Sequence, residues 1–365
     1  VYKRQKKGTF ELCISNAAVS RKEETDMAFV TLKDVAQQAG VSAAAVSQIL
    51  HDKGRFSNET RQLVLKTVEE MGYVPDQRAR SMRSSATKTV GLLVPDLRNA
   101  YFAELVSSME EGLYAHGFST LIGTSAETVK RQDAFIKNLL GQRIDGAIVV
   151  PQGSDSPGVK SLIARDLPLV FVDRRVQGIE SVPFVVSDPY TGIREAMEEL
   201  VALGHRRIGY IAHSSLESYS VNEREVAFRT AAPELLHGDT GIVVDCGSTY
   251  ESRCHTVDYL LECGVTAIIC AYSPDAITII GLLHDRGIEL GTQMSLISFD
   301  DIAPFRLMTP KISVISQQAE QMGRQGVDLL LEAMQSGVHQ GGSTIHVPTV
   351  YLSRGSVARV VVSAQ

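Results

Sequence analysis

The candidate nucleophiles and metal ligands of this sequence do not form a recognisable catalytic motif. His205 is of a type that binds metals or transfers protons, but it falls at a predicted helix end just before a strand, where a structural hydrogen-bonding role is favoured. The five cysteines are an odd number without a Cys-x-x-Cys pair, which favours buried free thiols over disulfides or a zinc site. No GxGxxG follows the first predicted strand, and GxxxxGK[ST], GxSxG and HExxH are absent. We therefore expect no enzymatic activity, no cofactor and no metal site.

A second group of candidate residues lies on one side of a short predicted helix. In TLKDVAQQAGVSAAAVSQIL, Leu32, Val35, Ala36 and Ala39 follow the spacing of one apolar helix face. Thr31 suits an N-cap, Gly40 a helix end with positive φ, and Ser42 the N-cap of a second helix in which Val46, Ile49 and Leu50 point inward. Two helices joined by so tight a turn predict a helix-turn-helix. The other face of the second helix is free to enter a groove: Ala43, Ala44, Ser47, Gln48 and His51.

A third helix is predicted to complete this small domain. It begins at Ser57 or Asn58, continues to Glu70, and has its core side at Leu63, Val64, Val68 and Met71. A small helical bundle that contacts another protein is the alternative to DNA binding.

The charge of the chain is unevenly distributed. The net charge is -6, but Thr31 to Lys88 carry nine Lys/Arg against six Asp/Glu, and the first 30 residues carry six against four. A modestly basic head on an acidic body suits a polyanion-binding module joined to a second domain. No run approaches the length of a membrane span and no signal peptide is evident, so a cytoplasmic location is expected. The first 26 residues show no sustained period, and we expect a tail of low order with Met27 as the native start.

From Thr89 onwards, strand and helix patterns alternate. TVGLLVP, FSTLIGT, DGAIVVP and LPLVFVD are apolar runs of strand length, and RIGYIA, GIVVD, TAIICA and SLISF repeat the alternation after Pro189. Continuous apolar strands with intervening helices predict two parallel, doubly wound sheets covered on both faces. Ligands of such sheets bind at the carboxyl ends of the strands, here in a cleft between two halves.

The stretch from Thr31 to Arg83 closely resembles the DNA-binding head and hinge of the lactose/galactose repressor (LacI/GalR) family of bacterial transcription factors. The resemblance continues at PDLRNAYFAEL, RIDGAIVV, LPLVFVDR, ELVALGHRRIGYI and SLISFDD. It implies an all-α helix-turn-helix head with a hinge helix, followed by a two-lobed α/β effector domain like that of periplasmic binding proteins. The implied limits are a tail at 1–27, a head at 28–75, a hinge at 76–88 and an effector and dimerisation domain at 89–365, with lobe 1 at about 89–187 and 316–344 and lobe 2 at about 188–315 and 345–365.

By this resemblance the second helix reads bases in the major groove through Ala43, Ala44 and Gln48. The alanines offer only methyl contacts, whereas Gln48 can pair with adenine. The family more often has Thr at Ala45, Arg at Gln48 and Asn at His51, so an operator sequence cannot be transferred. Contacts to DNA phosphates, which position the head without specifying sequence, are expected from Lys33, Ser42, Ser47, His51, Ser57 and Arg61.

The resemblance also assigns a hinge and an effector site. QRARSMRSS matches a segment that becomes helical on the operator, with Met82 as a wedge in the minor groove and Arg78, Arg80 and Arg83 supplying charge; a flexible linker is the alternative. The implied effector residues are Asn99, Tyr101, Phe102, Asp173, Ser220, Arg224, Ser273 and Asp300. Asp300 or Asp301 could instead cap a loop, and Ser273, in place of a frequent ligand-binding Asp, suits the N-cap of a helix with Pro274 at its first position.

The sequence therefore predicts a homodimeric repressor, or a higher oligomer, that binds operator DNA under the control of a small-molecule effector. Carboxylates, an Arg and an aromatic ring suit a small polyol, and a ribose-like pentose, a nucleoside and a purine all stay open. Either inducer or corepressor action is compatible with the sequence. A solute-binding protein and an enzyme of the doubly wound fold are the alternatives, opposed respectively by the helix-turn-helix and by the lack of a catalytic motif. No membrane partner is expected.

Overall fold

A computed structural model describes residues 30–74, 86–213, 218–237, 241–336 and 342–360, which divide into two units between Arg83 and Ser84. The predicted tail and the hinge residues Arg78, Arg80, Met82 and Arg83 lie outside the described residues. Within the predicted linker, the backbone N–H groups of Thr87 and Lys88 donate to the Asp145 carboxylate at 2.8 and 2.7 Å. These two residues therefore belong to the second unit.

The first unit contains three helices, α1 (Leu32–Gln38), α2 (Ala43–Leu50) and α3 (Asn58–Glu70). The side chains of Thr31, Ser42 and Ser57 each accept a backbone N–H from the first turn of a helix, which satisfies a donor that the helix itself cannot. Gly40, at φ +66°, follows α1 and turns the chain into α2. The predicted helix-turn-helix and its caps are confirmed.

The core of this head differs from the prediction on α3. Val35, Val46 and Val64 are completely buried, and Ala36, Ala39 and Ile49 surround them. Leu63, predicted to be a core residue, is 49% exposed, and Thr67 is buried instead. Val64 and Thr67 are three residues apart and share a helix face, whereas Leu63 falls on the outer side. The Thr67 hydroxyl is satisfied because it donates to the Leu63 carbonyl at 2.8 Å.

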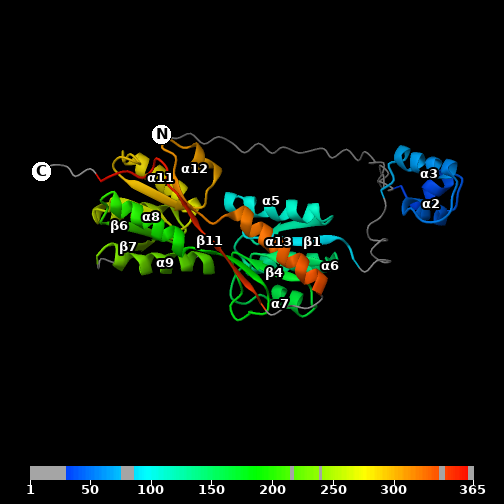
Figure 1. Cartoon of the computed structure of the whole chain (residues 1–365), viewed down its shortest axis with the longest axis horizontal. Coiled ribbons are helices and arrows are strands. Elements are labelled where there is room, and N and C mark those ends of the chain that lie inside the picture. Colours follow the sequence, from blue (N-terminus) through cyan, green and yellow to red (C-terminus); the bar gives the residue numbers. More distant parts are fainter. Residues whose placement is uncertain (1–29, 75–85, 214–217, 238–240, 337–341, 361–365) are drawn as a thin grey trace, which may run out of the picture. The chain divides into compact units, whose positions relative to one another are not determined.

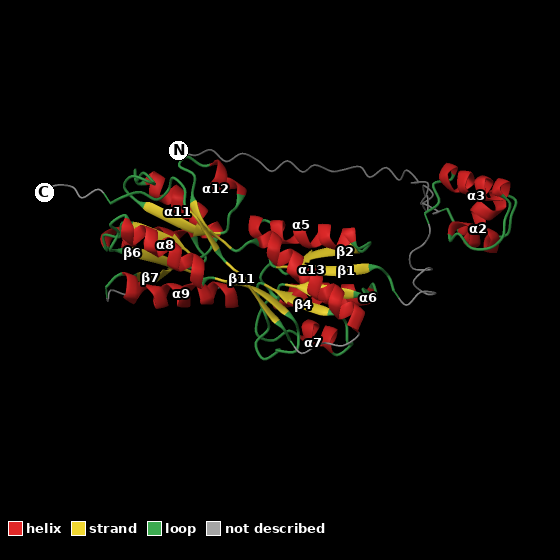
Figure 2. Ribbon diagram, viewed as in Figure 1, coloured by secondary structure: helices red, strands yellow, loops and turns green. Residues whose placement is uncertain are grey.

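The second unit consists of two lobes, each with a six-stranded sheet between layers of helices (Figures 1 and 2). The first sheet is wholly parallel, in the order β11-β5-β4-β3-β1-β2. Its elements are β1 (Thr89–Val94), α5 (Ala100–Ala115), β2 (Ser119–Thr124), α6 (Val129–Gly141), β3 (Gly146–Val149), α7 (Pro157–Ile163), β4 (Leu169–Val172), β5 (Phe184–Asp188), α13 (Ala319–Ser336) and β11 (Thr344–Pro348). The strand order reverses at β1 and β3, and the carboxyl ends of strands at such a reversal are where doubly wound sheets commonly bind ligands.

The second sheet has the order β12-β10-β9-β8-β6-β7 and is parallel except for β12, which runs antiparallel to β10. Its elements are α8 (Tyr190–Ala202), β6 (Ile208–Ala212), α9 (Tyr219–Leu235), β7 (Ile242–Asp245), α10 (Tyr250–Glu262), β8 (Ala267–Cys270), α11 (Ser273–Asp285), β9 (Ser295–Phe299), α12 (Ala303–Leu307), β10 (Ser313–Ser316) and β12 (Val350–Leu352). Here the strand order reverses at β6 and β8. Each sheet is covered on both faces by separate apolar clusters, so the predicted doubly wound fold is confirmed.

The chain passes between the lobes three times, after β5, after β10 and after β11. The first two passages agree with the predicted crossings. The third passage follows Pro348, whereas the expected boundary between the lobes lay at about residues 344 and 345. The difference arises because Thr344–Pro348 pairs in parallel with Phe184–Asp188 and so belongs to the first sheet. In Figure 1, β11 is part of the red stretch that leads from the edge of the first sheet into lobe 2.

Candidate functional site

The eight predicted effector residues are all buried, and they come from the strand ends and helix starts of both lobes. Asp173 follows β4 and is 2% exposed, Arg224 lies on α9 at 3%, and Asp300 follows β9 at 3%. Burying charged groups costs free energy unless each finds a partner. The contacts of these side chains therefore indicate what this part of the chain is built to do.

On the lobe 1 side, three of these residues form a connected group. Asn99 caps α5, because its side-chain oxygen accepts the Tyr101 N–H at 3.1 Å. The Tyr101 hydroxyl donates to Asp173 Oδ1 at 3.1 Å. Burial, with the nearby charges of Asp173 and Asp300, raises the pKa of Tyr101 well above its usual value, so this phenol stays a hydrogen-bond donor. Phe102 packs beside it, with its ring centroid 5.0 Å from that of Tyr101.

On the lobe 2 side, Arg224 forms one hydrogen bond and one cation–π contact. Its Nη1 donates to the Ala271 carbonyl at 2.5 Å, and its guanidinium lies 4.3 Å from the centroid of Phe299. Its Nε is buried without a hydrogen-bond partner among the described residues. Ser220 lies one helical turn before Arg224, and its hydroxyl forms a hydrogen bond with the Ser218 hydroxyl at 3.1 Å. A buried, unpaired guanidinium N–H is a donor available to a ligand.

A chain of hydrogen bonds links the lobes at the crossing after β10. Ser273 Oγ donates to Asp300 Oδ2 at 2.8 Å, Gln317 Nε2 donates to Asp300 Oδ1 at 2.6 Å, and Ser187 Oγ donates to Gln317 Oε1 at 2.7 Å. The predicted N-cap role of Ser273 is wrong, because Tyr272 is the N-cap and α11 begins at Ser273 itself. The Ser273 hydroxyl is used instead to hold the Asp300 carboxylate.

Electrostatics tie the two sides together. Burial raises the pKa of Asp173, the positive charges of Arg174 and Arg224 lower it, and the negative charge of Asp300 raises it further. Charges from both lobes therefore act on one carboxylate. Asp173 in lobe 1 therefore lies close enough to Arg224 and Asp300 in lobe 2 for their charges to interact.

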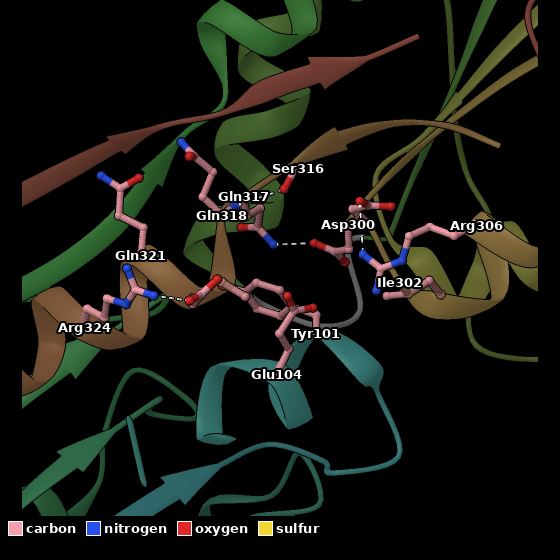
Figure 3. A pocket seen from close by; sticks show the side chains of 13 residues that line it. Tyr101, Glu104, Asp300, Ile302, Arg306, Ser316, Gln317, Gln318, Gln321 and Arg324 are labelled. Carbon is pink, nitrogen blue, oxygen red and sulfur yellow. Dashed lines mark hydrogen bonds and ion pairs between the residues drawn. The ribbon is translucent and has the colours of Figure 1, made fainter. Parts of the chain in front are cut away.

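An open pocket of about 410 Å³ lies beside this cluster and is shown in Figure 3. Two of the predicted residues, Tyr101 and Asp300, line it, together with Gln317. The other lining residues are Glu104, Asp301, Ile302, Arg306, Ser316, Gln318, Ala319, Glu320, Gln321 and Arg324. Asn99, Phe102, Asp173, Ser220, Arg224 and Ser273 are not part of its lining. The pocket thus opens onto one edge of the predicted cluster.

Sequence reasoning missed three polar residues of this region, Gln317, Arg174 and Tyr272. Arg174 is 4% exposed and its Nη1 donates to Glu127 Oε2 and Gln152 Oε1, both at 2.7 Å. Burial raises the pKa of Tyr272 to about 12. Arg174, Gln317 and Tyr272 each lie within two residues of the end of a strand, namely β4, β10 and β8. Their position directly after a strand is the sequence feature that could have identified them as site residues.

His205 has the structural role that its position suggested. Its Nδ1 lies 2.8 Å from Thr266 Oγ1 and its Nε2 lies 2.9 Å from the Ala358 carbonyl. Burial lowers its pKa, so the neutral imidazole is favoured. The cysteines within the described residues are free thiols, as expected.

The predicted DNA-reading face of α2 is accessible. Ala44 and Gln48 are exposed and Ala43 is half-buried. Among the predicted phosphate contacts, Lys33, Ser42, His51 and Ser57 are exposed, whereas Ser47 and Arg61 are half-buried. Arg61 already forms an ion pair with Asp52, so a phosphate would have to compete with that carboxylate. The contacts with DNA remain predictions.

Comparisons with known proteins place both units. Residues 31–76 match the model of the bacterial regulatory proteins of the lacI family, and residues 197–357 match a periplasmic binding protein-like domain. The head therefore carries the DNA-binding domain of the lacI family of bacterial regulatory proteins. The transcriptional repressor CytR of Escherichia coli is 28% identical over 348 residues, which is 92% of this chain and 98% of the repressor.

Two solved structures extend the comparison. The transcriptional regulator CelR in complex with cellobiose is 25% identical, with a TM-score of 0.66 over 90% of this chain and 99% of that one. The Lac repressor dimer bound to operator and an anti-inducer is 23% identical, with a TM-score of 0.77 over the same shares, which supports the fold. The lacI-type head, together with repressors as relatives over most of the chain, identifies this chain as a DNA-binding transcriptional regulator. No helix within the described residues has the length and apolarity of a membrane span.

Proposed function

We propose that this chain is a homodimeric repressor whose affinity for operator DNA is set by a small sugar-like effector bound between its lobes. The observation that carries the effector site is the buried cluster of Asp173, Arg224 and Asp300, in which Arg224 Nε has no partner among the described residues. Two carboxylates and a guanidinium can together accept from and donate to the neighbouring hydroxyls of a polyol. The solved complex of the regulator CelR with cellobiose supports a sugar ligand for this chain.

The effector class follows from the aromatic residues of the cluster. Phe102 is 2% exposed and packs against Tyr101, so its ring face suits the flat apolar side of a pentose or of a purine base. We favour a ribose-like pentose, because the cluster is rich in groups that bind hydroxyls. A nucleoside or purine is the second candidate.

A dimer face is proposed along α5 and the edge strand β2. Tyr114 on α5 is 74% exposed, and Leu121 and Ile122 on β2 are 36% and 42% exposed. β2 is the last strand of its sheet and has one unpaired edge. Exposed apolar side chains beside an open strand edge are features of an interaction surface.

Control of DNA binding is proposed to act through the lobe crossings. A ligand that binds one lobe angle better than another shifts the protein toward that angle. In a dimer this shift changes the spacing of the two heads, and the coupling is typically about 1–3 kcal/mol. This coupling applies both to an inducer, which lowers the affinity for DNA, and to a corepressor, which raises it.

Thermal unfolding of the full chain with D-ribose, nucleosides and purine bases tests the effector site. A ligand at 100 times its dissociation constant should add about 2.7 kcal/mol to the free energy of unfolding. Arg224→Ala should abolish this gain, and Arg229→Ala is the matched control, because Arg229 lies on the same helix but is paired with Glu225 at the surface. Equal ligand responses of the two variants would contradict the proposed site.

Operator binding is tested by selecting sites from a random pool of double-stranded DNA and then measuring affinity with and without the effector. We expect an enriched sequence with twofold symmetry and an affinity that changes when the effector is added. Failure to enrich any sequence would favour the solute-binding alternative. An unchanged affinity with a bound effector would remove the coupling but leave the effector site intact.

A further inference from the structure

A second polar cluster lies in lobe 2 and shares no residue with the predicted effector site. His213 directly follows β6, Cys246 directly follows β7, and Asp275 lies in the first turn of α11. The three ligand atoms lie within 4.8 Å of one another, and all three residues are buried. Three chain segments that are far apart in sequence therefore bring an imidazole, a thiol and a carboxylate to one point.

The separations within this cluster are close to those of a metal site. His213 Nδ1 lies 2.5 Å from Asp275 Oδ2, Cys246 Sγ lies 3.1 Å from the same oxygen, and Sγ lies 3.9 Å from Nδ1. Around a tetrahedral Zn²⁺ with bonds of about 2.0–2.3 Å, ligand atoms stand about 3.3–3.6 Å apart. The three observed distances lie on either side of this range. Shifts of the ligand atoms by less than about 1 Å would therefore give the separations of a tetrahedral site.

Arg253 supports the carboxylate from the outside. Its Nε and Nη2 both contact Asp275 Oδ1, at 2.9 and 2.8 Å. The other oxygen, Oδ2, is thereby left facing His213 and Cys246. Ligating carboxylates are commonly oriented by such an outer hydrogen bond.

We propose that His213, Cys246 and Asp275 bind a divalent transition-metal ion, with Zn²⁺ as the ion their chemistry fits best. A mixed nitrogen, sulfur and oxygen set suits Zn²⁺ and its spectroscopic substitute Co²⁺, whereas Mg²⁺ and Ca²⁺ prefer oxygen ligands alone. Binding forms a metal–sulfur bond as the Cys246 S–H bond breaks, and the proton passes to the buffer. One thiolate and one carboxylate offset the two positive charges of the ion, and the guanidinium of Arg253 leaves the site with one net positive charge.

The position of the cluster suits a metal site that also contacts a small-molecule ligand. It lies at the carboxyl ends of β6 and β8, where the strand order of lobe 2 reverses, and such a crevice is where ligands of doubly wound sheets bind. Three protein ligands leave a fourth position for water or for a group of a ligand. A hydrogen-bonded ion-pair cluster without metal is the competing explanation, and it predicts no affinity for Zn²⁺.

Metal titration of the untagged full chain, stripped with a chelator and dialysed, tests the proposal. We expect one Zn²⁺ per chain by calorimetry, and with Co²⁺ a near-ultraviolet absorption band from thiolate-to-metal charge transfer. Cys246→Ser should remove this band, and His213→Ala should abolish binding. Arg253→Gln should weaken binding by about 10–100-fold, because it removes only the outer support.

Cys254→Ser is the matched control, since Cys254 is a half-buried free thiol on the neighbouring helix α10. It should bind Co²⁺ like the wild type, with the same absorption band. Absence of stoichiometric Zn²⁺ binding by the wild-type chain would overturn the proposal, whatever the stability of the variants. A band that persists in Cys246→Ser but vanishes in Cys254→Ser would also overturn it.

Discussion

Gln317 offers a direct test of the hydrogen-bond chain that joins the lobes. Its amide donates to the Asp300 carboxylate at 2.6 Å and accepts the Ser187 hydroxyl at 2.7 Å, and its side chain is 1% exposed. Gln317→Leu keeps the approximate size of the side chain but removes both hydrogen bonds. Asp300 then keeps its bond from Ser273 and loses its other donor.

The expected cost follows from these two bonds. A hydrogen bond to a charged group contributes about 1.5–3 kcal/mol and a neutral one about 0.5–1.5 kcal/mol, so the free energy of unfolding of the second unit should fall by about 2–4.5 kcal/mol. Most of this cost comes from the carboxylate. Adding Asp300→Asn to Gln317→Leu should therefore cost less than the sum of the two single changes, by at least about 1 kcal/mol.

Urea denaturation followed by circular dichroism measures these differences in the full chain, with the larger unit supplying most of the signal. Gln321→Leu is the control, because Gln321 lines the same pocket but is exposed. A surface change of this kind should stay within about 0.5 kcal/mol of the wild type. If Gln317→Leu were no more destabilising than Gln321→Leu, or if the double change were additive, the chain of hydrogen bonds would not contribute as described.

Three further outcomes are expected. Burial lowers the pKa of His205 in the folded chain, so folding opposes protonation of this imidazole. The stability that His205 contributes is therefore present above its unfolded pKa of about 6.5 and is lost as pH falls below that value. The melting temperature of His205→Gln should depend less on pH between 7.5 and 5.5 than that of the wild type. Gly323→Ala places a Cβ 2.8 Å from Ser108 and 3.1 Å from the Leu105 carbonyl, and should cost about 1–3 kcal/mol in urea denaturation, whereas Gly281→Ala, with nothing within 4 Å, should not destabilise the chain. Gln48→Ala should lower operator affinity by about 1–3 kcal/mol and relax specificity at one base pair, which binding to operators changed at each position would show.

Local signals in the sequence predicted the head and most of the body well. Thr31, Gly40 and Ser42 specify helix ends through short-range hydrogen bonds and backbone freedom, and these act within a few residues. The central strands that were predicted are continuous apolar runs, and burial on both faces leaves little choice of residue type there. The predicted edge strands β2 and β7 are only exposed or half-buried. The edge strand β11 alternates exposed residues with Ile345 and Val347, of which only Val347 is fully buried, so it carries a weaker signal; its pairing with β5 places it in the first sheet.

The contacts within the candidate site were less predictable, because they depend on long-range pairing. Ser273 looked like an N-cap from its neighbours, yet its hydroxyl bonds to Asp300, 27 residues later in the chain. Cys246 and His213 showed no metal-binding spacing, because their proximity arises from the adjacent ends of β6 and β7. Sheet order, which no local pattern specifies, decides which strand-end residues meet.

The hydrogen-bond chain at Gln317 also provides a physical link between ligand and hinge. Asp300 is at once a predicted effector residue and the acceptor of Gln317, which occupies the crossing between β10 and α13. An effector hydroxyl that bonds to Asp300 has an acceptor site open to it beside Ser273 and Gln317, because the two carboxylate oxygens together offer about four acceptor sites. A further donor on this carboxylate weakens or redirects its bond from Gln317, and Gln317 also contacts Ser187 on the other lobe. We therefore expect effector binding and lobe angle to be coupled at this one carboxylate. Variants of Gln317 should therefore change the response of operator affinity to effector more than they change effector affinity itself.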